Sequence, residues 1–182
     1  MQDTGIVRRI DELGRVVIPK ELRKTLRIRE GDPLEIFTDK DQLVFKKYSP
    51  IATINTFASA VADGIEELTE KTCLITDNDA VIYVSGGRGK DFLGKEISSD
   101  MEKALKDRKS LIINKSEGGK IIPIISDGNI EFENQIVVPI ISGGDCFGSV
   151  VLFDKDKGAR FNSGDVKFAK LGATFISKQF EC

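Results

Sequence analysis

The strongest constraint on the fold is a block of consecutive apolar residues near the start of the chain, Val16–Ile18. A half-buried strand alternates apolar and polar residues, whereas a continuous apolar run predicts a strand that is buried on both faces. The block follows an earlier apolar run, Ile6–Ile10, and a polar turn, Asp11–Gly14. The stretch therefore predicts a hairpin of two short strands, Ile6–Ile10 and Arg15–Ile18.

Burying both faces of the Arg15–Ile18 strand needs more apolar contact surface than the first domain can supply. Pro19 is suited to the start of a short helix, Lys20–Leu26, and two further strands are expected at Leu34–Thr38 and Gln42–Lys46. Pro50 then marks a domain boundary, so the first domain spans residues 1–50. A segment of this size has too little core volume to bury both faces of a strand. We expect an identical chain to supply the second face, which makes the domain an obligate dimer.

Positive charge is concentrated in the same stretch. Residues 1–29 hold eight Lys or Arg and four Asp or Glu, a net charge of +4. Residues 51–182 hold 16 Lys or Arg and 20 Asp or Glu, a net charge of −4. The basic residues beside the turn and on the helix are Arg8, Arg9, Arg15, Lys20, Arg23 and Lys24. Cations at the ends of rigid elements indicate a grip on a polyanion, and a basic head on an acidic body indicates that only the head faces nucleic acid.

After Pro50 the apolar period changes to that of a helix. Apolar residues recur at threes and fours over Thr53–Lys71, which predicts one amphipathic helix within a linker segment, residues 51–71. Two interpretations remain open for it. The helix lies on the sheet of its own domain, or it packs against the same helix of a partner chain in a bundle.

The rest of the chain, residues 72–182, is expected to form an α+β domain. Helical stretches are expected at Lys90–Leu93 and Asp100–Lys106, and a long final helix at Asp165–Phe180, with Asn162 and Asp165 at its cap. The final helix carries two apolar stripes, so it should be buried on two sides. The expected strands are Cys73–Thr76, Ala80–Val84, Ser110–Asn114, Lys120–Ile125, Asn134–Ile141 and Phe147–Phe153. This order predicts an antiparallel sheet flanked by helices.

Composition argues against most enzyme classes. The chain has no histidine, which removes the commonest general acid–base residue and the usual Cys/His zinc sites. Its three cysteines are odd in number and have no C-x-x-C spacing, as in a reducing cytoplasm. We expect no catalytic role, cofactor or metal. No signal peptide and no membrane-length apolar run are expected either, so the predicted location is cytoplasmic, on the nucleoid.

The opening stretch, Thr4–Arg23, resembles the signature of the AbrB family of bacterial transition-state regulators, and the resemblance extends over residues 4–50. It implies a swapped-hairpin fold, in which two chains interleave their strands into one β-barrel-like dimer. It also implies DNA contacts by arginines beside the first loop, Arg8 and Arg15, and by basic residues on the helix, Arg23 and Lys24. Arg9 and Lys20 are secondary candidates. Family members often have arginine at the position of Lys24, and lysine is better suited to a phosphate than to a guanine edge.

Residues 53–182 resemble a GAF sensor domain, most clearly in the segment Gly158–Ala169 that leads into the last helix. Three interpretations follow: a sensor for an unidentified small molecule, a module for oligomerisation without a ligand, or an enzyme of the sulfoxide-reductase type that would use Cys73 or Cys146. The chain matches the cyclic-nucleotide signature of GAF domains only in part, because Asp154 and Val166 replace its Asn and Glu.

Together, an AbrB-type head and a GAF-type body resemble regulators of sporulation genes. The expected function is a DNA-binding transcriptional activator or repressor that acts as a homotetramer. Its heads would pair through residues 1–50, and its bodies through the helices at 53–71 and 165–180. An AbrB-type antitoxin is the alternative for the whole chain, but residues 53–182 are too apolar and ordered for a toxin-wrapping tail.

Overall fold

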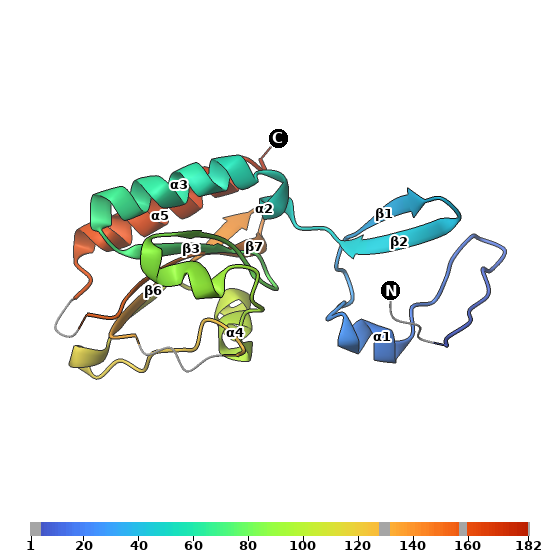
Figure 1. The fold of residues 1–182 in the computed structure, drawn as a ribbon, viewed down its shortest axis with the longest axis horizontal. Helices are drawn as coiled ribbons and strands as arrows, with labels where there is room; N and C mark the ends of the chain where they lie inside the picture. Colours follow the sequence, from blue (N-terminus) through green and yellow to red (C-terminus); the bar gives the residue numbers. More distant parts are fainter. Residues whose placement is uncertain (1–4, 128–131, 157–159, 182) are drawn as a thin grey trace. The chain divides into compact units, whose positions relative to one another are not determined.

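The computed structural model describes residues 5–127, 132–156 and 160–181 (Figure 1). The chain divides into two compact units, Met1–Tyr48 and Ser49–Cys182. The N-terminal unit contains helix α1 (Lys20–Thr25) and strands β1 (Leu34–Asp39) and β2 (Gln42–Lys47). β1 and β2 form an antiparallel hairpin whose turn places Lys40 in the left-handed region, with φ 55°.

The two strands predicted at Ile6–Ile10 and Arg15–Ile18 are wrong for the single chain, which forms no strand in either segment. The side chains of Val7, Ile10 and Val17 are 83%, 65% and 73% exposed. A strand forms only when its backbone donors and acceptors find partners and one of its faces is covered. Neither condition is met within one chain, and this is the deficiency that the apolar run predicted.

A lysine holds the loop between α1 and β1 in place. The Lys47 Nζ donates to the carbonyl oxygen of Arg27 at 2.9 Å and lies 3.3 Å from the Asp32 carboxylate. Asp32 in turn accepts the backbone N–H of Arg29 at 2.8 Å. These bonds fix the end of the basic helix to the end of the hairpin.

The C-terminal unit is built on one antiparallel sheet, as predicted, with strand order β4-β3-β7-β6-β5. Its strands are β3 (Thr72–Thr76), β4 (Val81–Ser85), β5 (Leu111–Asn114), β6 (Asn134–Ser142) and β7 (Asp145–Asp154). Its helices are α2 (Pro50–Thr53), α3 (Asn55–Thr69), the 3₁₀-helix η1 (Gly87–Phe92), α4 (Ser99–Asp107), the 3₁₀-helix η2 (Lys115–Glu117) and α5 (Ser163–Lys178). α3 and α5 lie side by side over one face of the sheet, and α4 lies on the other (Figure 1).

The central strands are mainly apolar, since both of their faces are buried. On β7, Val150 and Leu152 join the core under α3 and α5, while Val151 and Phe153 join the core beside α4. Phe153 there packs against Phe92 and Phe132, with ring centroids 5.3 and 4.5 Å away. Burial of apolar surface on both faces is the main source of this unit's stability.

The helix expected over Thr53–Lys71 forms as α3, and the short helix α2, which the sequence did not predict, precedes it. The strand expected at Lys120–Ile125 does not form, and a side chain replaces its ladder. The amide of Gln135 accepts from the N–H of Ile122 at 3.2 Å and donates to its carbonyl at 3.1 Å.

The join between the two units is short. The Tyr48 N–H donates to the Pro33 carbonyl at 3.0 Å, within the N-terminal unit. The next residue, Ser49, caps α2 by accepting the N–H of Ala52. Ile51 is then fully buried in the C-terminal core. A Cβ on Gly148 would overlap the Thr76 carbonyl oxygen and lie 2.8 Å from the Ile51 Cδ1, so glycine there allows β3 and this anchor to approach closely.

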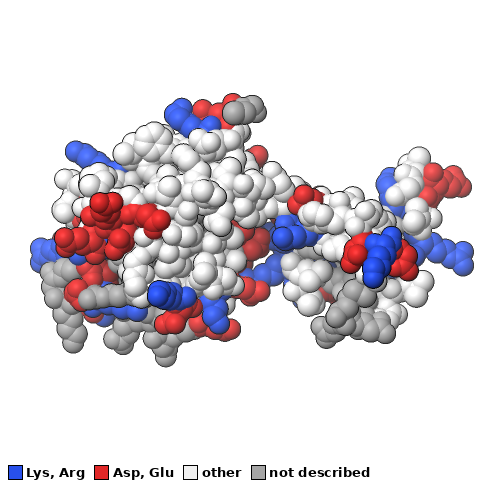
Figure 2. All heavy atoms as spheres, turned by 45° about the horizontal axis from the view of Figure 1, so that its top comes forward, with Lys and Arg blue, Asp and Glu red and all other residues white. Residues whose placement is uncertain are grey.

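The long helix α5 carries the predicted cap at Asn162 and Asp165, in the form of a capping box. One of its two apolar stripes packs on the sheet through Ala169, Ala173 and Ile176. On the other stripe, Leu171 and Phe175 are each 50% exposed, and Leu68 on α3 is 65% exposed. The face over α3 and α5 accordingly carries few charged side chains (Figure 2). No helix in the described ranges is long and apolar enough to cross a membrane.

Candidate nucleic-acid interface

The turn at Asp11–Arg15 is held by the Asp11 side chain. One oxygen, Oδ1, accepts the backbone N–H groups of Leu13 at 3.0 Å and Arg15 at 2.8 Å. The other, Oδ2, accepts the Arg15 Nε at 2.7 Å. Gly14, with φ 76°, donates its N–H to the Asp11 carbonyl at 2.9 Å. The backbone bonds and the guanidinium of Arg15 lower the pKa of Asp11, so the carboxylate is ionised at neutral pH.

Arg15 presents the free end of its guanidinium at this turn. Its side chain is 71% exposed. Only Nε is engaged among the residues that the structure describes, so the two terminal nitrogens point their donors at no protein acceptor. Arg8 and Arg9 are exposed on the segment before the turn, where the Arg8 Nη1 donates to the neighbouring Val7 carbonyl. Three guanidinium groups therefore flank one short turn.

The second group of predicted DNA-binding residues lies on α1. Lys20, Arg23 and Lys24 are all exposed. Their spacing of three and four residues places them on neighbouring positions of the helix surface. Figure 2 shows basic side chains projecting from the N-terminal unit. The structure thus separates the six candidates into a turn group and a helix group.

Reasoning from the sequence overlooked Asp11, which organises the turn group. Its signal was present, because Asp at the first position of a turn commonly accepts backbone N–H groups two or more residues ahead. The spacing of four residues to Arg15 also permitted the ion pair.

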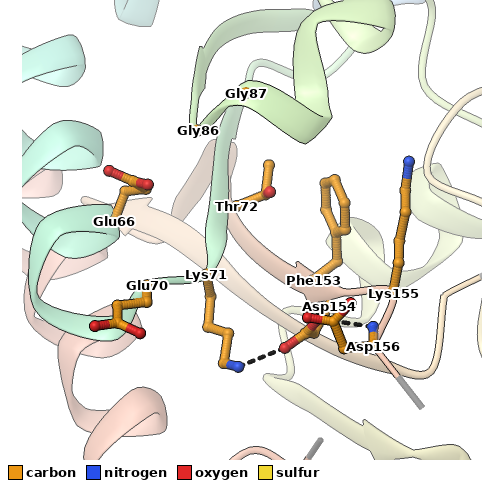
Figure 3. A pocket seen from close by; sticks show the side chains of 10 residues that line it. All are labelled: Glu66, Glu70, Lys71, Thr72, Gly86, Gly87, Phe153, Asp154, Lys155 and Asp156. Atoms are coloured by element: carbon orange, nitrogen blue, oxygen red, sulfur yellow. Dashed lines mark hydrogen bonds and ion pairs between the residues drawn. The ribbon is translucent and has the colours of Figure 1, made fainter.

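The C-terminal unit has a polar cavity of about 310 Å³. Glu66 of α3 and Glu70 at its C-cap lie on one side of it and residues at the end of β7 on another, with Gly86 and Gly87 at the start of η1 above (Figure 3). The lining residues are Glu66, Glu70, Lys71, Thr72, Gly86, Gly87, Phe153, Asp154, Lys155 and Asp156. Lys71 forms an ion pair with the buried Asp154. The Lys155 Nζ lies 5.8 Å from the centre of the Phe153 ring.

The cysteines considered for chemistry have ordinary structural surroundings. Cys73 is fully buried in the core under α3 and α5, and Cys146 is half-buried on β7. Burial raises the pKa of both thiols. A protonated thiol is a weak nucleophile, so neither site resembles an activated cysteine.

Comparison with known proteins identifies the family. A family model described as the C-terminal domain of stage V sporulation protein T, a transcription factor, matches residues 53–181. The chain is 44% identical to stage V sporulation protein T of Bacillus subtilis (strain 168) over 184 aligned residues, which cover 100% of this chain and 99% of the relative. The chain belongs to the stage V sporulation protein T family.

Other comparisons each match only one of the two units of this member of the stage V sporulation protein T family. The transition state regulatory protein AbrB of Bacillus subtilis is 50% identical over 66 residues, which cover 36% of this chain and 69% of AbrB. A model of the MazE bacterial antitoxins matches residues 7–52. The GAF-B domain of DevS from Mycobacterium smegmatis has the fold of the C-terminal unit, with a TM-score of 0.54, 15% identity, and coverage of 68% of this chain and 90% of that chain. The chain thus joins an AbrB-type head to a GAF-type body.

In this family member, the residues that resemble a cyclic-nucleotide signature have structural roles. Asp154 accepts from Lys71 and from the N–H of Asp156. Phe161 is buried, and Asp165 completes the cap of α5. Each side chain is explained by folding alone. Of the quoted segment Gly158–Ala169, the first two residues lie outside the described ranges.

Proposed function

We propose that this chain is a transcription regulator that grips double-stranded DNA through its N-terminal units and acts on sporulation genes. One observation carries the proposal: the exposed guanidinium of Arg15, fixed at Nε, presents two terminal nitrogens whose N–H donors no described residue uses. A planar fork of this kind matches a phosphate or a guanine edge. Membership of a transcription-factor family supports the same conclusion. The site of action is the nucleoid, in the cytoplasm.

The DNA-binding form of the N-terminal unit is a dimer with interleaved strands. The extended segments around the turn leave large apolar side chains in water, among them Val7 and Val17. Burying one such side chain contributes about 1.5–3 kcal/mol, and a second copy offers matching apolar segments. In this dimer each chain supplies Arg8 and Arg15 at one contact edge.

The helix group supplies a second contact edge. Arg23 and Lys24 are its main members, and Lys24 binds a phosphate because an ammonium lacks a planar fork. Arg9 and Lys20 add charge near the two edges. Positioning by phosphate contacts and reading by base contacts are separate tasks in such an interface.

DNA binding by this protein is expected to weaken steeply with salt. With roughly six phosphate contacts per dimer, a plot of log K against log salt concentration has a slope of about −5, because each contact releases a counterion. Fluorescence anisotropy with a labelled duplex, measured over a range of potassium chloride concentrations, gives this slope.

The variant Lys24→Ala serves as the comparison for that measurement. It removes one phosphate contact per chain, so the slope is expected to become shallower by about two per dimer. An affinity that stays constant across the salt range would contradict phosphate binding by these residues.

The bodies of two dimers pair through α3 and α5 and form a tetramer. The apolar stripe with Leu68, Leu171 and Phe175 lies on the solvent side of these helices. A water-exposed stripe of this length on paired helices matches the interface of a helix bundle. Two linked dimers of N-terminal units bind neighbouring DNA sites more tightly than one dimer does, because the second binding step is intramolecular.

The polar cavity is the proposed site of a small-molecule effector. Glu66 and Glu70 line it, and their carboxylates have no ion-pair partner in the part of the chain that the structure describes. We expect a small polar compound that binds here to raise the melting temperature by roughly 5–10 °C at about a hundredfold excess over its Kd. A thermal-shift screen of polar metabolites on the full chain measures this.

The variants Glu66→Gln and Glu67→Gln test where such a compound binds. Both remove one charge from α3, but Glu67 is exposed and does not line the cavity. The shift is expected to disappear in the first variant and to persist in the second. If no compound stabilises the wild-type chain, the body serves only for tetramerisation. The antitoxin alternative is disfavoured, since the described residues after Ser49 fold around two cores of their own.

A further inference from the structure

The Asp11 carboxylate binds the backbone and the side chain of one DNA-contacting residue at the same time. Its Oδ1 accepts the Arg15 N–H at 2.8 Å, and its Oδ2 accepts the Arg15 Nε at 2.7 Å. The carboxylate therefore fixes both the backbone position of Arg15 and the orientation of its guanidinium. An exposed arginine without such a partner samples many rotamers, and ordering them on binding costs free energy.

The orientation leaves one particular edge of the guanidinium open. Nε faces Asp11, so the two terminal nitrogens form the edge that faces outward. This end-on fork matches the paired acceptors O6 and N7 of guanine in the major groove. A base edge is uncharged, so the neighbouring carboxylate does not oppose this contact.

A phosphate bound at the same place would be repelled by a neighbouring negative charge. A phosphate bound to the Arg15 fork would also lie close to the ionised Asp11 carboxylate, and like charges at such distances repel. Asp11 also neutralises part of the charge with which Arg15 attracts the DNA backbone. The pair thus favours a base over a phosphate.

We infer that Asp11 is a specificity-determining residue: it presents the Arg15 fork to a base edge and opposes its use as a phosphate clamp. The inference rests on the proposed function, because it assumes that Arg15 contacts DNA. It assigns to Asp11 a positioning role and no DNA contact of its own.

The variant Asp11→Asn tests this inference. Asparagine keeps a carbonyl oxygen for the backbone N–H groups of the turn but loses the charge that holds the Arg15 Nε. The probes are a duplex selected from a random pool by the wild-type chain and a shuffled duplex of the same composition. We expect the ratio of the two affinities to fall about tenfold, mainly because binding to the shuffled duplex strengthens.

The matched control is Glu12→Gln. It makes the same change of charge in the same turn, and the Glu12 carboxylate has no hydrogen bond or ion pair with any described residue. Both affinities are expected to rise together in this variant, so that their ratio is kept. An equal ratio in Asp11→Asn and Glu12→Gln would overturn the inference.

A second variant distinguishes a loss of DNA discrimination from a loss of the folded structure. Asp11→Ser is neutral, and its hydroxyl can still cap the turn. It is expected to lose discrimination as Asp11→Asn does, and circular dichroism reports whether each variant is folded. A folded Asp11→Ser variant that discriminates like the wild type would also overturn the inference. A wild-type chain that selects no duplex from the pool would instead refute the proposed function.

Discussion

The substitution Arg15→Ala is expected to lower the affinity for a selected duplex by about a hundredfold without unfolding the protein. Each bidentate contact between arginine and guanine provides roughly 1–3 kcal/mol of discrimination, and a dimer carries two of them. The side chain is 71% exposed and takes no part in either core, so its removal leaves the fold intact. Gel-shift titration gives the affinity.

The variant Arg15→Lys distinguishes the contribution of the positive charge to DNA binding from that of the planar guanidinium. Lysine keeps the positive charge but has no fork. We therefore expect it to bind shuffled DNA as the wild type does, while losing most of its preference for the selected duplex. An unchanged gel-shift affinity in Arg15→Ala, with a normal circular dichroism spectrum, would refute the assignment of this residue to the DNA interface.

The double substitution Leu171→Glu and Phe175→Glu is expected to halve the mass of the assembly. Each side chain is 50% exposed in the single chain, so a carboxylate is tolerated there before the bodies pair. In a buried helix bundle the same carboxylates would lose their hydration without gaining partners, which costs several kcal/mol. Sedimentation equilibrium at micromolar concentration distinguishes a tetramer from a dimer.

The control on the same helix is Lys170→Glu. This residue is exposed and already charged, so the tetramer is expected to persist in that variant. The pairing of bodies would be refuted by a double variant that keeps the mass of the wild type. A wild-type protein that sediments as a dimer would count against it equally.

Local pattern was sufficient to predict most of the C-terminal unit. The segments Asn134–Ile141 and Phe147–Phe153 were predicted as strands of an antiparallel sheet, and they form β6 and β7. Asn162 and Asp165 predicted the start of the last helix, because a cap depends only on neighbouring residues. Such features depend on short-range geometry that one sequence contains.

Features that depend on distant partners were not predictable in the same way. The segment at Lys120–Ile125 has a strand-like composition, but the backbone of Ile122 bonds to the Gln135 side chain, and the Ile124 carbonyl accepts from the Ser98 N–H. The strands predicted for the first hairpin do not form in the described single chain, where their apolar side chains stay exposed. The short helix α2 and the burial of its Ile51 were not predicted, because the helical period of Thr53–Lys71 begins only after Ala52.

The candidate site was predicted unevenly for the same reason. The basic residues near the turn and on α1 are visible in the sequence, since they are close together along the chain. The partnership of Asp11 with Arg15 is local too and could have been inferred from its spacing. The polar cavity could not, because it combines the end of α3 with residues that follow β4 and β7.

The short join between the units has a consequence for where the chain can be divided. Tyr48 is bonded within the first unit, Ser49 caps the first helix of the second, and Ile51 is anchored in its core. A C-terminal fragment must therefore begin at or before Ser49 to keep the cap of α2 and the buried side chain of Ile51.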